Sequence, residues 1–304
     1  MDVLVNVAEF AAKGFIVLVV VAFSVALLFR RRERSGGDEV RGRLGVTPLN
    51  ERWTRTIERL ELALLTPKER KKFLKECKAQ RKAKRKAEPK RNLFIVDFKG
   101  DLMAQQVESL RSEVSALLAV AKPSDEVVIR LESAGGAAHA YGFAASQLAR
   151  FAPKKIKVTV CVDRVAASGG YMMACVADHI VAAPFAIIGS IGVAAPVPNI
   201  HRLLDRYGVD YENITAGKYK RTLSFLAENT EEGRVKFQEQ IQETHDLFKS
   251  FVAEHRDGID IDEVATGEYW HASRAAELGL VDELATSDDY LMSRLDGAEL
   301  YELS

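Results

Sequence analysis

From residue 92 onward, hydrophobic and polar residues follow two alternating patterns. Short apolar runs that fit buried strands are followed by segments whose apolar residues recur at helical spacing. We expect strands at 93–98, 127–131 and 157–162, and helices at 104–120, 138–151 and 168–177. Strands that alternate with helices are typical of βαβ units, so the pattern predicts an α/β fold with a mainly parallel sheet.

Residues 180–200 contain no charged side chain, which on hydropathy alone would suit a membrane span. Three prolines and two glycines interrupt this stretch, and a lipid-exposed helix with so many breakers would leave backbone groups unpaired. We expect instead two short buried strands joined by turns. Further along, the pattern predicts helices at 230–256, 260–265 and 272–278, with Gly279 as the C-terminal cap of the last one.

The N-terminal segment has the pattern of a membrane anchor. Residues 14–29 carry no charge, and with the preceding apolar residues the run reaches about 20 residues, enough to span a bilayer. The arginines follow the run at 30–34, and the run continues past a small-residue site at 24–26, so a cleaved signal peptide is disfavoured. By the positive-inside rule, these arginines predict that the rest of the chain lies in the cytoplasm.

Composition changes twice between the anchor and the α/β segment. Residues 35–50 are glycine-rich and suit a linker, and 50–65 have the spacing of a short amphipathic helix. Residues 68–91 hold thirteen Lys and Arg against three Glu, which suits either a solvated helix or attraction to anionic lipid headgroups. Because Phe73 is the only aromatic residue there, nucleic-acid binding is not expected. The chain therefore divides into an anchor with its basic flank (1–34), a linker (35–91) and a main domain (92–304).

Composition also narrows the chemistry. The formal net charge is zero, and three widely spaced cysteines form neither a disulfide framework nor a CxxC metal pattern. Cys161 and Cys175 suit small, buried apolar positions. The six histidines form no HxxxH or HExxH motif, and no glycine-rich nucleotide-binding motif is present. We expect neither a metal ion nor a cofactor.

Ser168 is the candidate nucleophile. It stands in a run of small residues at 165–171, where a helix is expected to begin. Serine needs an adjacent base to become a useful nucleophile, and no Ser/His/Asp set stands out. Lys220, on a glycine-led turn, is the candidate base, although a lysine serves as a base only where burial favours its neutral form. His139 is the one histidine near the expected cleft. On the local sequence alone, Ser168 could equally be a helix N-cap and Lys220 a surface lysine.

Two sites could present backbone N–H groups to an oxyanion. The Gly-Gly turn in 133–136 follows an expected strand, and Gly169 stands where a helix is expected to begin and its N–H groups are free. Donors of this kind stabilise the negative oxygen of an acyl-transfer intermediate. The alternative for 133–136 is a plain loop before a helix.

Eight short motifs follow one another in the second half of the chain. They occupy residues 131–136, 165–171, 183–184, 189–193, 207–209, 216–220, 265–267 and 279–283. Together with the N-terminal anchor, these motifs and their order resemble the signal peptide peptidase A family of membrane-anchored serine proteases, most closely its SohB branch. Several motifs in one order are far more specific than any single one.

The resemblance implies a Clp-protease/crotonase-like α/β fold, preceded by one transmembrane helix, and a Ser–Lys dyad. Ser168 matches the nucleophile and Lys220 the general base, while Ser190 matches a serine that orients the lysine. Gly136 and the N–H of Gly169 match the oxyanion donors. In single-copy relatives the serine and lysine of one site can come from neighbouring protomers, so a homo-oligomeric ring is expected. Expected substrates are peptides or unfolded segments, including remnant signal peptides, and the expected location is the bacterial inner membrane.

The chain departs from the family pattern in one loop. The family usually has Ser-Pro-Gly-Gly where residues 133–136 are Ser-Ala-Gly-Gly, and loss of the proline removes a fixed φ. Relatives often act at the outer face of the membrane, whereas the arginines at 30–34 predict the cytoplasmic side, and both positions stay open. Two other functions also stay open: a crotonase-like acyl-CoA enzyme, and a catalytically silent membrane scaffold in which Ser168 only caps a helix.

Overall fold

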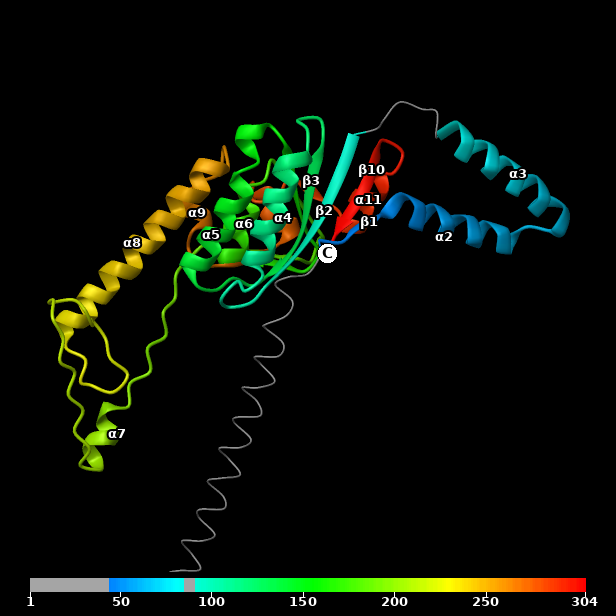
Figure 1. Ribbon diagram of the computed structural model, residues 1–304. Helices are drawn as coiled ribbons and strands as arrows, with labels where there is room; N and C mark the ends of the chain where they lie inside the picture. The colour runs from blue at the N-terminus through cyan, green and yellow to red at the C-terminus, as the bar shows by residue number, and fades with distance from the viewer. Residues whose placement is uncertain (1–43, 85–90) are drawn as a thin grey trace, which may run out of the picture. The chain divides into compact units, whose positions relative to one another are not determined.

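The structure, a computed structural model, describes residues 44–84 and 91–304 (Figure 1). The chain separates into two compact units, of which the second, Gly45–Ser304, contains nearly all of these residues. The transmembrane helix expected in 1–34 lies outside the described residues. Within the described ranges, no helix combines the length and apolar composition needed to cross a membrane.

A mainly parallel sheet forms the centre of this unit, which confirms the expected α/β fold. Its strands pair in the order β1-β10-β2-β3-β4-β6-β9, and all pairs along this order are parallel except the edge pair of β1 with β10. The bounds are β1 (Val46–Pro48), β10 (Ala298–Leu303), β2 (Arg91–Gly100), β3 (Glu126–Ser133), β4 (Lys157–Val162), β6 (His179–Ala182) and β9 (Glu283–Leu284).

Three short strands branch from this sheet and carry the chain toward the candidate site. β5 (Val165–Ala167) pairs with β3 and with β7 (Ile187–Gly189), and β7 pairs with β8 (Tyr269–His271). β6 and β7 confirm the two short strands expected within 180–200. β5 and β8 were not expected.

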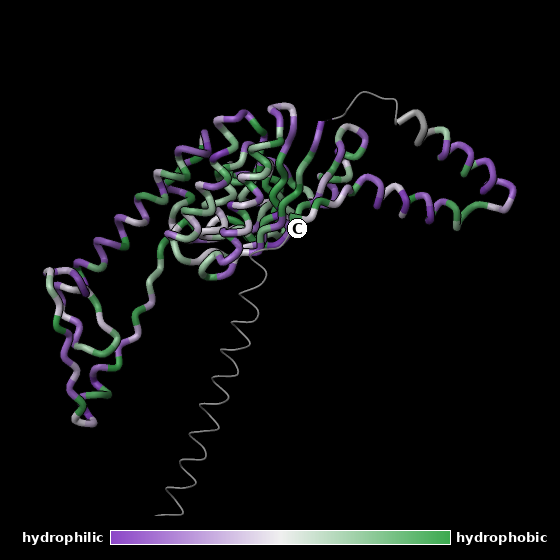
Figure 2. Tube along the Cα trace, in the orientation of Figure 1, coloured by the Kyte–Doolittle hydropathy of each residue, from purple (hydrophilic) through white to green (hydrophobic). Residues whose placement is uncertain are grey.

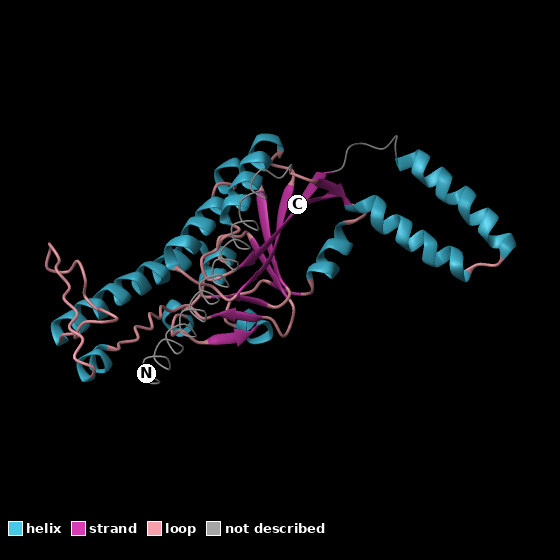
Figure 3. Cartoon of the chain, turned by 60° about the horizontal axis from the view of Figure 1, so that its bottom comes forward, coloured by secondary structure: helices cyan, strands magenta, loops and turns pink. Residues whose placement is uncertain are grey.

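Helices lie on both faces of the sheet (Figure 3). Along β2, Leu93 and Ile95 belong to one buried cluster and Val96 and Phe98 to the other, so successive residues serve opposite faces. The larger cluster includes residues of α4 (Val107–Val120), α5 (Ala138–Ala149) and α6 (Gly169–Ala174). The smaller includes residues of α2 (Leu49–Leu64) and α11 (Ser287–Arg294). The basic segment forms α3 (Pro67–Lys84), which is largely hydrophilic (Figure 2).

The remaining α-helices lie between β7 and β9 along the chain. They are α7 (His201–Arg206), α8 (Glu231–His255), α9 (Ile261–Val264) and α10 (Ala272–Glu277). Gly279 follows α10 with a φ of +75°, as expected of a C-terminal cap. The apolar side of α8 is only partly buried. Only Phe248 and Val252 are buried, while Val235 and Leu247 are 53% and 70% exposed.

Two of the cysteines are confirmed as buried apolar residues. Cys161 and Cys175 are both almost fully inaccessible and form no disulfide. Burial raises the pKa of the Cys175 thiol to about 12, so the reactive thiolate is absent at neutral pH. Both side chains therefore contribute to the packing of the core.

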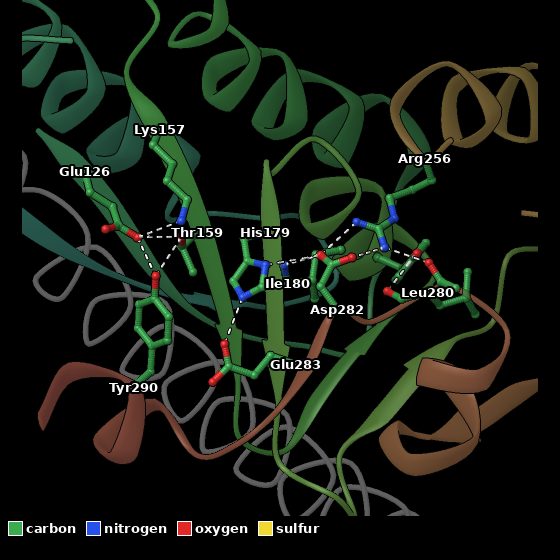
Figure 4. A network of polar contacts seen from close by, with 12 residues as sticks. Glu126, Lys157, Thr159, His179, Ile180, Arg256, Leu280, Asp282, Glu283 and Tyr290 are labelled. Carbon is green, nitrogen blue, oxygen red and sulfur yellow. Dashed lines mark hydrogen bonds and ion pairs between the residues drawn. The ribbon is translucent and has the colours of Figure 1, made fainter. Parts of the chain in front are cut away.

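An ion pair fixes the segment that leads from α10 into β9 (Figure 4). The Arg256 guanidinium donates to both carboxylate oxygens of Asp282, at 3.0 and 2.7 Å, and to the Gly279 carbonyl at 2.6 Å. Asp282 also accepts from the N–H of Ile180 at 2.7 Å, which joins the segment to β6. Burial alone would raise the pKa of Asp282, but the Arg256 and Ile180 hydrogen bonds and the charge of Arg256 hold it below its ordinary value.

Arg256→Ala is expected to lower the free energy of unfolding by about 2 kcal/mol at pH 7, because hydrogen bonds to charged groups are lost. A carboxyl whose pKa is depressed in the folded state stabilises the protein above its ordinary pKa, and that contribution disappears as pH falls through the folded value. The difference between wild type and Arg256→Ala should therefore shrink between about pH 5 and pH 2. Urea unfolding of both proteins at several pH values measures this difference in unfolding free energy. A difference that is constant or grows in acid would contradict this role of the ion pair.

Candidate active site

Ser168 occupies a strained position between a strand and a helix. It directly follows β5 and precedes α6, and its N–H donates to the Gly189 carbonyl at 2.8 Å. Its φ of +52° and ψ of −122° lie in a region that non-glycine residues rarely occupy, at a cost of about 1–3 kcal/mol. Ser168 is the N-cap residue of α6, but its side chain makes no capping hydrogen bond. Ser168 is thus the N-cap by position, as the alternative expected, but its hydroxyl does not cap the helix and is left available for chemistry.

Strand pairing brings Ser190 beside Ser168. Ala167 is the partner of Gly189 in the parallel pairing of β5 with β7, so the residues that follow them, Ser168 and Ser190, leave the same end of adjacent strands. Ser190 also has a positive φ, of +51°. Its N–H donates to the Glu268 carbonyl at 2.7 Å, and its hydroxyl donates to the Gly267 carbonyl at 3.3 Å. The second bond is long for a hydroxyl donor, so this side chain can exchange it for another partner.

The Gly-Gly turn after β3 lies directly against the start of α6. Gly135 has a φ of +89°, and a Cβ added there would lie 2.7 Å from both the Gly169 nitrogen and the Ser168 Cβ. Only glycine permits this approach together with this φ. In the described part of the chain, the N–H of Gly136 has no hydrogen-bond acceptor. Gly169 is the first residue of α6, where the helix offers its N–H no acceptor. The two N–H groups thus belong to residues that directly follow Ser168 itself and Gly135, whose backbone approaches the Ser168 Cβ.

Lys220 lies in the segment between α7 and α8. Its N–H donates to the Gly217 carbonyl at 3.1 Å, and its side chain is exposed. Among the residues that the structure describes, no hydrogen bond joins Lys220 to Ser168 or Ser190. Its neighbour Lys218 is held by Glu232, with a nitrogen–oxygen distance of 2.7 Å. The structure thus brings together Ser168, Ser190, Gly136 and Gly169 but not Lys220, and the roles of all five residues stay predictions.

His139, the one histidine near the expected cleft, is exposed near the start of α5, and it makes no hydrogen bond to another described residue. Across residues 44–84 and 91–304, no three His, Cys, Asp or Glu side chains gather as a metal site.

Sequence reasoning missed one residue at this site. Tyr141, on the first turn of α5, is fully buried, and its hydroxyl lies 2.6 Å from the Ser133 hydroxyl beneath the Gly-Gly turn. The tyrosine stands eight residues after Ser133 in sequence, but only the docking of α5 shows that the two side chains meet. No local pattern signals this contact.

Two family models match nearly the whole chain. The model described as "Peptidase family S49" matches residues 150–300, and that described as "Peptidase family S49 N-terminal" matches residues 2–148.

Among curated proteins, a "Probable protease SohB" of Haemophilus influenzae is 57% identical over 208 residues, which cover 68% of this chain and 59% of that protein. One from Buchnera aphidicola subsp. Acyrthosiphon pisum is 55% identical over 207 residues, or 68% of this chain and 62% of that protein. One from Buchnera aphidicola subsp. Schlechtendalia chinensis is 43% identical over 309 residues, or 97% of this chain and 100% of that protein. The matches thus span about three fifths of the first two relatives and all of the third. A solved structure of a membrane-bound stomatin-specific protease with a substrate peptide covers 71% of this chain and 93% of its own, with a TM-score of 0.47 and 14% identity.

Proposed function

This chain belongs to peptidase family S49, with SohB proteases among its relatives, and on that premise we propose that it is a serine endopeptidase with a Ser168–Lys220 dyad. The observation that carries the proposal is the Ser168 hydroxyl, which makes no capping hydrogen bond and is held by a strained backbone beside the Gly-Gly turn. Strain of this kind persists where function requires it. A scaffold would need neither the free hydroxyl nor the close approach of the glycines.

The reaction begins when Lys220, in its neutral form, takes the Ser168 proton as the serine oxygen attacks a peptide carbonyl. The carbonyl oxygen becomes negative and accepts hydrogen bonds from the N–H groups of Gly136 and Gly169. Lys220 then gives the proton to the leaving amine, and an acyl-enzyme remains. Water that Lys220 activates hydrolyses this ester and restores Ser168. The Ser190 hydroxyl exchanges its hydrogen bond to the Gly267 carbonyl for one to Lys220 and so orients the lysine.

Lys220 is supplied by a neighbouring chain in a homo-oligomeric ring. Two features support this: the exposure of Lys220, and the apolar side chains that the single chain leaves exposed around it. Eight of these lie in the segment from β7 to α8: Val197, Leu203, Tyr207, Val209, Tyr211, Ile214, Tyr219 and Phe225, which are 38–92% exposed. An apolar surface of this kind marks a protein contact. Burial in the contact would also favour the neutral lysine that the reaction needs.

The substrates are peptides or unfolded segments, including remnant signal peptides, and the anchor in 1–34 holds the enzyme at the bacterial inner membrane. This part of the proposal rests on the sequence of the anchor and on the family resemblance. Small residues beside Ser168 leave room for a substrate backbone to approach closely.

A fluorophosphonate probe tests the nucleophile in the full chain. The probe is expected to label the wild type and to lose at least nine tenths of that labelling in Ser168→Ala, because only an activated serine reacts readily. Ser146→Ala, at an exposed serine of α5, is the matched control and should label normally. Casein hydrolysis should follow the same pattern. Equal labelling of wild type and Ser168→Ala would favour another site, and no labelling or hydrolysis in any of them would favour the scaffold or the acyl-CoA enzyme.

A further inference from the structure

We propose that Tyr141 and Ser133 are positioning residues that hold the oxyanion-binding turn against Ser168, an inference that rests on the proposed function. Neither side chain would contact substrate. Both act through the backbone N–H groups of Gly136 and Gly169.

The hydrogen bonds around this pair run in one direction. The Tyr141 hydroxyl donates to the Asp101 carbonyl at 2.7 Å, and its single hydrogen is used there. The 2.6 Å contact with Ser133 is therefore a bond in which the serine donates and the tyrosine oxygen accepts. The Ser133 oxygen in turn accepts from the N–H of Gly135 at 3.0 Å. A continuous series of hydrogen bonds thus leads from the Gly-Gly turn through both hydroxyls to the loop after β2.

These hydrogen bonds also determine which N–H group of the turn is free to bind a substrate oxygen. Ser133 takes the N–H of Gly135, so of the two glycines in the turn Gly136 is the one whose N–H stays free among the described residues. The Ala137 N–H is occupied as well, because it donates to the Leu102 carbonyl at 2.8 Å. Gly136 is thereby the glycine of the turn whose N–H makes no hydrogen bond within the described part of the chain.

The same tyrosine packs against the second donor. A Cβ added at Gly169 would collide with the Tyr141 ring, which means that the start of α6 lies directly on that ring. A Cβ at Gly100 would collide with the hydroxyls of Tyr141 and Ser133, so β2 leaves room for the pair. Tyr141 thus fixes Gly169 through its ring and Gly136 through its hydroxyl.

Packing alone does not require the tyrosine hydroxyl. A phenylalanine would fill the same buried space, whereas a buried hydroxyl must be given partners to offset its desolvation. Burial raises the pKa of Tyr141, so the hydroxyl keeps its proton and remains a donor. Removing it would leave the Asp101 carbonyl without this donor and Ser133 without its acceptor, and the turn would lose its fixed position.

Steady-state kinetics of the full chain test this role. Tyr141→Phe is expected to lower kcat about 10- to 100-fold, less than the loss of a whole oxyanion donor, with KM within about twofold. A peptide aldehyde, which becomes a tetrahedral adduct at the serine, should bind more weakly by a similar factor. A purely structural role would not move kcat and aldehyde binding together while sparing KM.

Two further variants complete the design. Ser133→Ala should give a similar loss, and the double variant Ser133→Ala/Tyr141→Phe should lose little more, because both break one chain of bonds. Tyr171→Phe is the matched control: it also removes one hydrogen bond from a fully buried tyrosine to a carbonyl, that of Leu280 at 3.1 Å. Its kcat should stay within about twofold of wild type while its stability falls.

The outcomes separate the two proposals. A normal kcat in Tyr141→Phe, in a wild type that Ser168→Ala inactivates, would overturn the positioning role alone. Equal losses of kcat in Tyr141→Phe and Tyr171→Phe would also overturn it, since general loosening of the core would explain both. A chain whose hydrolysis survives Ser168→Ala, or that hydrolyses nothing, would overturn the proposed function and this role with it.

Discussion

Lys220→Ala lowers kcat for casein hydrolysis on the order of 10⁴-fold, to about the level of Ser168→Ala, if the dyad is correct. Without a base, the Ser168 hydroxyl keeps its proton and is a poor nucleophile. The residual rate would come from binding and from the two N–H donors. Because the two residues act as one unit, the double variant should be no slower than either single one.

Lys218→Ala is the matched control for this experiment. Lys218 lies two residues earlier in the same turn and pairs with Glu232 across an exposed contact, in which both side chains are about two thirds exposed. Exposed pairs contribute about 0–1 kcal/mol, so this variant should fold and keep nearly full activity. Full activity in Lys220→Ala, or a large loss in Lys218→Ala instead, would show that the base has been assigned to the wrong residue.

Mixing two inactive variants restores activity if the lysine comes from a neighbour. In a ring assembled from equal amounts of Ser168→Ala and Lys220→Ala chains, about a quarter of the contacts would join an intact serine to an intact lysine. Activity should therefore rise from near zero to about a quarter of the wild-type level. The two chains can be co-expressed with different tags and purified by both, and hydrolysis then measured per site.

The same experiment identifies the alternative arrangement. If serine and lysine come from one chain, no mixed assembly contains an intact site, and the mixture stays as inactive as its parts. The control mixes wild type with the double variant Ser168→Ala/Lys220→Ala, which shows how much activity an inactive neighbour removes. Co-purification of both tags confirms that mixed assemblies formed.

The sequence predicted the strands and helices whose pattern is local. β2, β3 and β4 are continuous apolar runs because both faces of the sheet are buried, and the helices after them show clear periodicity. α11 and β10 were not expected, because residues 287–303 mix polar and apolar positions. β10 forms a strand because it pairs with β2, more than 200 residues earlier. Such long-range pairing overrides a weak local preference.

The residues of the candidate site also divide into those that short motifs predict and those that depend on contacts between distant segments or between chains. Ser168, Ser190 and the glycines were found from short motifs, and strand pairing brings them together. Tyr141 could not be found, because its contact with Ser133 depends on how α5 docks on the sheet. The arrangement of Lys220 within an assembled site could not be derived either, since nothing in a single sequence describes how one copy of the chain meets another.

The exposure of Lys220 in the single chain bears on when cleavage begins. If Lys220 is supplied by a neighbouring chain, a newly made monomer would carry a serine without its lysine and would stay inactive until it met a second copy. Its activation would depend on the concentration of the chain: as copies accumulate, the number of complete sites would rise more steeply than the number of chains. A cell could then set the onset of proteolysis through expression level alone, and dilution would return the enzyme to latency.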